Sequence, residues 1–97
     1  MPLTAPQALA RLEDVTAAAR VDAGAAFEVS WTGPDNAGDY LTIVPAGAAE
    51  GAYLDYAYTA YGTPATLTAP DEAGRYEVRY VTGQGDRTLA SAPVEVR

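Results

Sequence analysis

The segment that decides the fold runs from residue 71 to 80 and reads DEAGRYEVRY. An acidic turn leads into Gly74, and after it aromatic or apolar residues alternate with charged ones. This period of two is typical of a β-strand that buries one face. Tyr76 stands at the start of the strand, so we expect its hydroxyl to bond back to the backbone of the turn and to hold the turn against the strand.

Further strands separated by turns are predicted along the rest of the chain. Residues 27–31 alternate with the same period, and residues 40–44 are β-branched and aromatic. Turn-forming stretches such as GPDN at 33–36 interrupt the pattern. We expect strands at 12–17, 27–31, 40–44, 56–61, 64–69, 75–81 and 87–96. The Ala-rich stretch 7–20 leaves a helix open as the alternative to the first strand, and Pro93 indicates a bulge or an edge position in the last.

Seven such strands predict an all-β fold, a single antiparallel β-sandwich. Residues 11–97 would form this domain, and the Pro- and Ala-rich residues 1–10 would be a linker or an artificial N-terminus. A chain of 97 residues can bury one core without a metal or a disulfide. Tyr80 is expected to be partly buried. The side chains expected in the core are Phe27, Val29, Trp31, Leu41, Ile43, Leu67, Tyr76, Val78 and Leu89.

Several separated motifs carry a resemblance to a known family. FEVSWTGP at 27–34, followed by GDY at 38–40, is similar to an immunoglobulin-like repeat of bacterial von Willebrand factor type A proteins. Further matching segments, among them YAYT at 56–59 and APDE at 69–72, extend the resemblance over roughly residues 25–96. Trp31 on the second strand and the lack of a cysteine pair also resemble fibronectin type III domains. The resemblance implies an immunoglobulin-like, fibronectin type III-like sandwich of about seven strands.

The same resemblance implies a function without catalysis. Such repeats are accessory, spacer or protein-interaction modules beside a metal-dependent adhesion domain. The Asp-x-Ser-x-Ser motif of the adhesion domain is absent from this sequence, so the chain would be the companion domain. The parent protein would be periplasmic or associated with the cell envelope, and the chain itself soluble. The expected partner is another protein or a neighbouring domain of the same parent chain.

The composition argues against several function classes. The formal net charge is -7, and the six basic residues are all arginines spread along the chain, which disfavours binding to nucleic acid or to an anionic membrane surface. Without cysteine or histidine, thiolate chemistry, imidazole catalysis and the usual zinc ligands are absent. No apolar run is long enough for direct membrane insertion. We therefore predict no catalytic, cofactor-binding or metal-binding residue, and no enzyme.

The predicted interaction surface is a group of tyrosines near an edge strand. Tyrosine offers a large contact area at a low entropy cost, as protein interfaces require. Tyr56 and Tyr58 would share one face of their strand, with Tyr61 on the other. We expect Tyr56, Tyr58 and Tyr61 to anchor a partner, and Arg79 to be a charged contact at the rim. The alternative is that these rings, with Tyr53, only cover a thin core.

Two other kinds of site stay open from the sequence. Coplanar exposed tyrosines beside Asp35, Asn36 or Asp55 would favour a carbohydrate-binding module, whereas an apolar fringe would favour a protein partner. The oxygen-rich loop of Asp35, Asn36 and Asp39 has the ligand type that calcium takes. Aspartate and asparagine are also ordinary turn residues, so we do not expect a calcium site. The charged face of the strand 75–81 is expected to be solvated.

Overall fold

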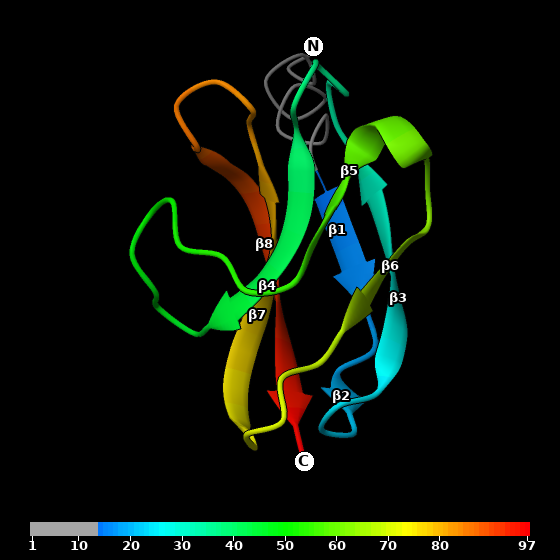
Figure 1. Cartoon of the computed structure of the whole chain (residues 1–97), viewed down its shortest axis with the longest axis vertical. Coiled ribbons are helices and arrows are strands. Elements are labelled where there is room, and N and C mark those ends of the chain that lie inside the picture. The colour runs from blue at the N-terminus through cyan, green and yellow to red at the C-terminus, as the bar shows by residue number, and fades with distance from the viewer. Residues whose placement is uncertain (1–13) are drawn as a thin grey trace, which may run out of the picture.

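The computed structural model describes residues 14–97, which form an all-β structure with one short 3₁₀-helix (Figure 1). The strands are β1 (Asp14–Ala17), β2 (Arg20–Val21), β3 (Ala26–Thr32), β4 (Tyr40–Pro45), β5 (Tyr56–Tyr58), β6 (Ala65–Thr68), β7 (Gly74–Val81) and β8 (Thr88–Val96), and the helix η1 spans Thr59–Tyr61. The predicted linker at 1–10 and the start of the predicted strand 12–17 lie outside the described residues. Within 14–97, no helix is long and apolar enough to cross a membrane.

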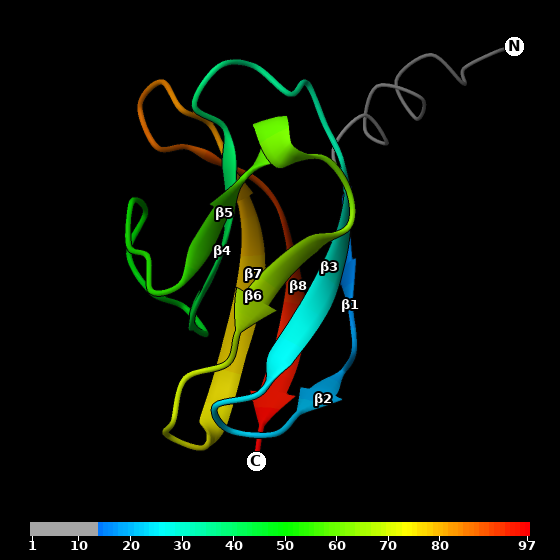
Figure 2. The ribbon, with the colours of Figure 1, turned by 45° about the vertical axis from the view of Figure 1, so that its right-hand side comes forward.

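The strands form two sheets that face each other, as in a β-sandwich (Figure 1 and Figure 2). The small sheet has the order β1-β3-β6, and the large sheet has the order β2-β8-β7-β4-β5. Neighbouring strands are antiparallel except for β2 and β8, which run parallel. The chain crosses from the small to the large sheet between Ala17 and Arg20. This crossing adds the two-residue strand β2, so residues 14–97 contain eight strands where the sequence predicts seven.

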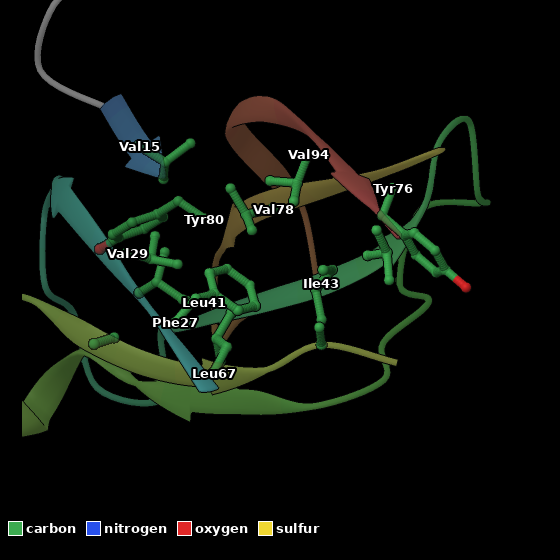
Figure 3. Close-up of a cluster of buried hydrophobic side chains, with 13 residues drawn as sticks. Val15, Phe27, Val29, Leu41, Ile43, Leu67, Tyr76, Val78, Tyr80 and Val94 are labelled. Atoms are coloured by element: carbon green, nitrogen blue, oxygen red, sulfur yellow. The ribbon is translucent and has the colours of Figure 1, made fainter. Parts of the chain in front are cut away.

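The core lies between the two sheets and takes side chains from both (Figure 3). Each fully buried aliphatic side chain stabilises the fold by about 1.5–3 kcal/mol relative to an exposed one. Most of the predicted core residues are buried, and Val15, Val94 and Val96 join them. The confirmed set is Phe27, Val29, Leu41, Ile43, Leu67, Tyr76 and Val78.

Three predicted burial states are wrong. Tyr80 is fully buried rather than partly buried, whereas Trp31 and Leu89 are only partly buried at the margin of the core. The Trp31 ring packs against Tyr80 with 5.7 Å between ring centroids, and its Nε1 donates to the Gly62 carbonyl at 3.0 Å. An indole whose N–H bonds to a surface loop keeps one edge near solvent. Tyr80 from the large sheet is therefore interior, and Trp31 from the small sheet packs at its margin.

The turn before β7 is fastened as its sequence predicts. The Tyr76 hydroxyl donates to the carbonyl oxygen of Glu72 at 2.8 Å, and the ring is buried. The buried ring fixes the strand against the core, and the hydroxyl fixes the turn against the strand. The expected contact of Tyr76 with the turn backbone is confirmed.

Pro93 lies where the last strand has a free edge. The backbone nitrogens of Glu95 and Arg97 donate toward β2 and its preceding residue. Because N–H directions alternate along a strand, the Pro93 nitrogen points to this same side, beyond the reach of β2. Proline has no N–H, so it suits this unpaired position. β8 is an inner strand of the large sheet, between β2 and β7, so the free edge at Pro93 is confined to the part of β8 that β2 does not reach. The irregularity of the β7–β8 ladder lies between Tyr80 and Val81.

Removing the Tyr76 hydroxyl should weaken the fold measurably. We expect Tyr76→Phe to lower the free energy of unfolding by about 1–2 kcal/mol, because the bond to the turn is lost and the Glu72 carbonyl loses its partner. The matched control is Tyr61→Phe, since the Tyr61 side chain is 86% exposed. Denaturant unfolding of both variants checks this expectation. An unchanged midpoint for Tyr76→Phe would contradict the role assigned to this turn.

Candidate binding site on the outer face of the large sheet

The outer face of the large sheet is covered, rather than solvated, over β4 and around Arg79. Along β4, Leu41 and Ile43 point into the core, and Thr42 and Val44 point to the opposite face. Thr42 and Val44 are nevertheless fully buried. The segment 46–55, which connects β4 to β5 beside the sheet in Figure 1, bonds to this face and supplies cover for it. The strand β4 is thus buried on both faces.

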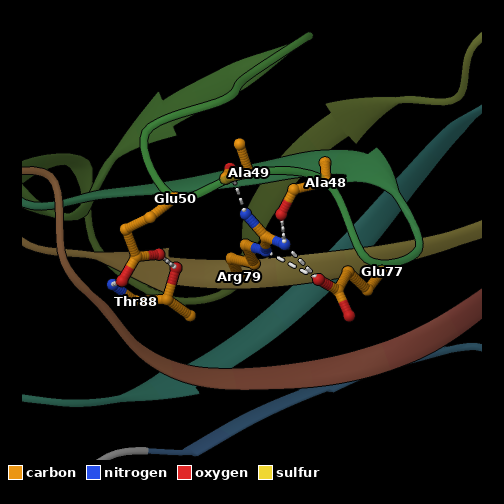
Figure 4. Close-up of polar contacts among 6 residues, drawn as sticks. All are labelled: Ala48, Ala49, Glu50, Glu77, Arg79 and Thr88. Carbon is orange, nitrogen blue, oxygen red and sulfur yellow. Dashed lines mark hydrogen bonds and ion pairs between the residues drawn. The ribbon is translucent and has the colours of Figure 1, made fainter.

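Arg79 is the main attachment of this segment (Figure 4). Its guanidinium donates from Nη2 to the Ala48 carbonyl at 2.6 Å, from Nη1 to the Ala49 carbonyl at 3.1 Å, and from Nε to the Glu77 carboxylate at 2.7 Å. The residue is only 6% exposed. The predictions of a solvated charged face and of Arg79 as a rim contact are therefore wrong for this side chain. The planar guanidinium can serve three acceptors at once, which favours burial over exposure.

Two further side chains fasten the segment 46–55. The Thr42 hydroxyl donates to the Asp55 carbonyl at 2.7 Å and accepts from the Leu54 backbone N–H at 3.3 Å. The Glu50 carboxylate accepts from both the hydroxyl and the backbone N–H of Thr88 (Figure 4). The Thr88 hydroxyl, more than the N–H, lowers the pKa of Glu50 below its usual value. The segment is therefore tied to β4, β7 and β8 together.

Tyrosines from three segments meet beside this cover. Tyr40 belongs to β4, Tyr56 and Tyr58 to β5, and Tyr53 to the segment 46–55. Tyr56 stands in the middle, with ring centroids 6.0 Å from Tyr40, 5.6 Å from Tyr53 and 5.5 Å from Tyr58. All three contacts are edge-to-face, with ring planes at 72°, 87° and 79°. Such contacts stabilise aromatic pairs by about 0.5–1.5 kcal/mol each, so the arrangement holds its own shape.

These rings surround an open pocket of about 300 Å³, which we call the tyrosine pocket. The Tyr40 hydroxyl donates to Asp86 Oδ1 at 3.2 Å across its wall. Burial, followed by the charge of Asp86, raises the pKa of Tyr40 to about 12, so its hydroxyl stays a neutral donor. The pocket is lined by Gly38, Tyr40, Tyr53, Tyr56, Tyr58 and Asp86.

The predicted site residues separate into three groups in the structure. Tyr56 and Tyr58 lie on one face of β5, as predicted, and line the tyrosine pocket. Tyr61 is not on that strand, because the chain turns into η1 after Tyr58, and its exposed ring is not among the residues lining the pocket. Arg79 is buried beneath the segment 46–55. Sequence reasoning did not find the roles of Tyr40 and Asp86.

The turn into η1, directly after β5, is stabilised by the contacts of Thr59. Thr59, at the start of η1, is fully buried, and its hydroxyl donates to Asp35 Oδ1 at 2.7 Å. Its backbone N–H donates to the Asp39 carbonyl at 2.9 Å. Thr59 still points inward, as the alternation requires, but the chain then turns into η1, where the Gly62 N–H donates to the Thr59 carbonyl at 2.8 Å. The alternation of Tyr56, Ala57 and Tyr58 therefore does not continue to Tyr61.

A buried polar network lies at the end of the sandwich next to the pocket. The Tyr80 hydroxyl donates to Asp39 Oδ2 at 2.7 Å and accepts from the Asp35 backbone N–H at 2.8 Å. Asp39 Oδ1 accepts from the Gly83 N–H at 2.8 Å. A Cβ at Gly33 would lie 2.5 Å from the Tyr80 ring, so the chain passes the ring only where it has no side chain. The network joins the loop 33–39 to the β7–β8 hairpin.

The oxygen atoms considered for calcium are engaged in this network. Asp39 Oδ2 also accepts from the Asn36 N–H at 3.0 Å, and the Asp35 carboxylate accepts from Thr59. A calcium ion needs six to eight oxygen ligands. In the described part of the chain, no group of three or more His, Cys, Asp or Glu side chains is placed to hold a metal ion. These acidic side chains act here as acceptors for the protein's own donors.

A carbohydrate-binding site is expected to have coplanar exposed tyrosine rings beside Asp35, Asn36 or Asp55. The pocket rings are close to perpendicular instead. Asp55 Oδ2 accepts from the Thr68 N–H at 2.6 Å. Leu54, which follows Tyr53 on the covering segment, is exposed. Near-perpendicular rings and an exposed leucine on the same segment fit the expectation for a protein partner better than the expectation of coplanar rings for a sugar.

No family model, no curated protein sequence and no solved structure matches this chain significantly. The resemblance to immunoglobulin-like repeats of von Willebrand factor type A proteins therefore stays a prediction.

Replacing Arg79 with lysine should loosen the covering segment. Lysine keeps the charge but cannot reach three acceptors with a planar fork, and we expect the free energy of unfolding to fall by about 2 kcal/mol. The amide hydrogens of Leu54 and Thr88, bonded to Thr42 and Glu50, should exchange faster with solvent. Arg75→Lys is the matched control, because Arg75 lies on the same strand and is exposed. Equal amide exchange in both variants would contradict the anchoring role.

Alkaline pH should weaken the fold through Tyr80. Burial, with the bond to Asp39, raises the pKa of Tyr80 to about 12, above the ordinary tyrosine value of 10.0. Since the folded state holds this proton more tightly, its contribution is complete below about pH 10 and is lost as pH rises through 12. We expect on the order of 2 kcal/mol to be lost across this window. Tyr80→Phe, less stable at neutral pH, should show a shallower slope, and parallel slopes would contradict the assignment.

Proposed function

We propose that this chain is a non-catalytic interaction module of immunoglobulin-like fold that binds a protein through the tyrosine pocket. The partner is a separate protein or a neighbouring domain of the same parent chain. The observation that carries the proposal is the grouping of half-exposed tyrosines around one open pocket, beside the covered part of the large sheet. Exposed aromatic side chains concentrate at protein interfaces because they bury large areas with few rotatable bonds.

The fixed shape of the pocket supports a binding role. Tyr53 stands on a segment held by Arg79 and Glu50, and Tyr56 contacts three other rings. A site that is ordered before binding loses little side-chain entropy when the partner arrives. Leu54, the next residue after Tyr53 in the sequence, is exposed as well. The surface is therefore suited to a protein rather than to sugar rings, which stack on flat, coplanar aromatic platforms.

The finer identity rests on the sequence resemblance. The two facing sheets and the bond from Tyr76 to the Glu72 carbonyl are in keeping with an immunoglobulin-like, fibronectin type III-like sandwich. On this proposal the module belongs to a bacterial von Willebrand factor type A protein of the cell envelope. Its rigid body would set the spacing of neighbouring domains, and its pocket would dock one of them or a separate partner.

Affinity capture from an envelope fraction tests the proposal. We expect the wild-type domain to retain a protein, and Tyr56→Ala to lose it, because Tyr56 contacts each of the other pocket rings. Tyr61→Ala is the matched control, since Tyr61 lies outside the pocket lining, and it also tests the separate prediction that Tyr61 is an anchor. Retention of a glycan in place of a protein would support the carbohydrate alternative. An empty lane from the folded wild-type bait would contradict a binding role and leave a spacer.

A further inference from the structure

The tyrosine pocket combines aromatic walls with one carboxylate. Four of its six lining residues are tyrosines, and the one charged residue among them is Asp86. Aromatic faces carry partial negative charge and attract cations that approach within about 6 Å of the ring. Rings that meet edge-to-face present both faces and edges to the pocket, so a small cation can stack on one ring while it contacts the others. The lining has the chemistry of a site for an organic cation.

The charge of Asp86 is not neutralised by an ion pair within the described residues. The ion pairs in residues 14–97 join Arg20 to Glu95 and Arg79 to Glu77. Arg87 follows Asp86 in the sequence and is not among the residues lining the pocket. Glu50 adds its negative charge near Tyr40. The whole chain has a formal charge of -7, so both the local and the overall field attract a cation.

The geometry at Asp86 favours a guanidinium over an ammonium group. Asp86 Oδ1 accepts from the Tyr40 hydroxyl, whereas Asp86 Oδ2 has no hydrogen-bond partner among residues 14–97. A guanidinium can pair with a carboxylate through parallel N–H donors and at the same time stack on aromatic rings. An ammonium is a compact, strongly hydrated charge with neither property. A pocket of about 300 Å³ has room for such a head group with part of its apolar stem.

We infer that the tyrosine pocket binds the guanidinium of an arginine side chain presented by a partner protein. This inference rests on the proposed function and names the group that the site recognises. Tyr53, Tyr56 and Tyr58 would contact the planar cation, and Asp86 would pair with its N–H groups. Arginine is enriched in the buried centre of protein interfaces, where a preformed aromatic pocket supplies the desolvated contact.

Titration with small arginine derivatives, followed by two-dimensional NMR, tests the inference directly. The probes are Nα-acetylarginine amide, its neutral isostere Nα-acetylcitrulline amide, Nα-acetyllysine amide, whose side chain stays an ammonium, and tetramethylammonium. We expect saturable shifts of the pocket resonances with the arginine probe, at an affinity about tenfold or more above that of the citrulline probe. Raising the salt concentration should weaken the arginine interaction, because the pocket is open to solvent. Equal shifts with arginine and citrulline, or none with arginine, would overturn the inference.

Variants locate the interaction and guard against loss of fold. Asp86→Asn is the sharpest change, because asparagine also tolerates the positive φ of 50° at this position, and it should weaken arginine binding about tenfold. Tyr56→Phe keeps the ring and should retain binding, whereas Tyr56→Leu should lose it. Tyr61→Ala, outside the pocket lining, should bind as the wild type does. Wild-type affinity in Asp86→Asn would overturn the pairing with Asp86.

Two outcomes separate this inference from the proposed function. If a captured protein depends on Tyr56 but is not displaced by the arginine probe, the pocket binds a protein through another group, and the inference fails while the proposed function stands. If lysine amide or tetramethylammonium binds as well as or better than the arginine probe, the assignment to guanidinium fails. If the arginine probe displaces the captured protein and the citrulline probe does not, both the inference and the proposed function are supported.

Discussion

The guanidinium of Arg79 is the contact on which the outer face of the large sheet depends. It lies almost fully buried between the sheet and the segment 46–55, and it donates to two carbonyls of that segment and to Glu77. A buried cation is costly unless its donors are satisfied. Arg79 therefore keeps the segment against the sheet, and the segment in turn carries Tyr53 to the pocket. Without this attachment the cover over β4 would be held only by the bonds of Thr42 and Glu50.

The buried pair of Tyr80 and Asp39 has a similar effect at the end of the sandwich. One carboxylate connects the interior of the core, through Tyr80, with the backbone of Gly83 in the β7–β8 hairpin. Gly38 and Tyr40 flank Asp39 in the sequence and line the tyrosine pocket. The acidic loop 35–39, considered as a calcium candidate from the sequence, therefore holds neighbouring segments together through these hydrogen bonds. It sets the positions of the pocket wall on one side and of the hairpin bearing Asp86 on the other.

These two attachments explain why the pocket has a fixed shape on a small protein. The rings of Tyr40, Tyr53, Tyr56 and Tyr58 come from three segments, and each segment is fastened by hydrogen bonds of its own. Preorganised aromatic walls lower the entropy cost of binding. The carboxylate of Asp86 gives the walls a preference for positive charge. On the proposed function, such a pocket would contribute recognition rather than chemistry.

The sequence by itself determined the β-strands other than β2, the bond of Tyr76 to its turn, most of the core and the placing of Tyr56 and Tyr58 on one face, although β5 ends three residues earlier than predicted. These features depend on residues close together in the chain, through the period of two and local turn chemistry. Only the tertiary structure decided the burial of Arg79, whose carbonyl partners lie 30 and 31 residues away. The bond between Tyr40 and Asp86 spans 46 residues. Such contacts follow from how the loops fold over the sheet, which no local pattern records, so the pocket could not be assembled from the sequence alone.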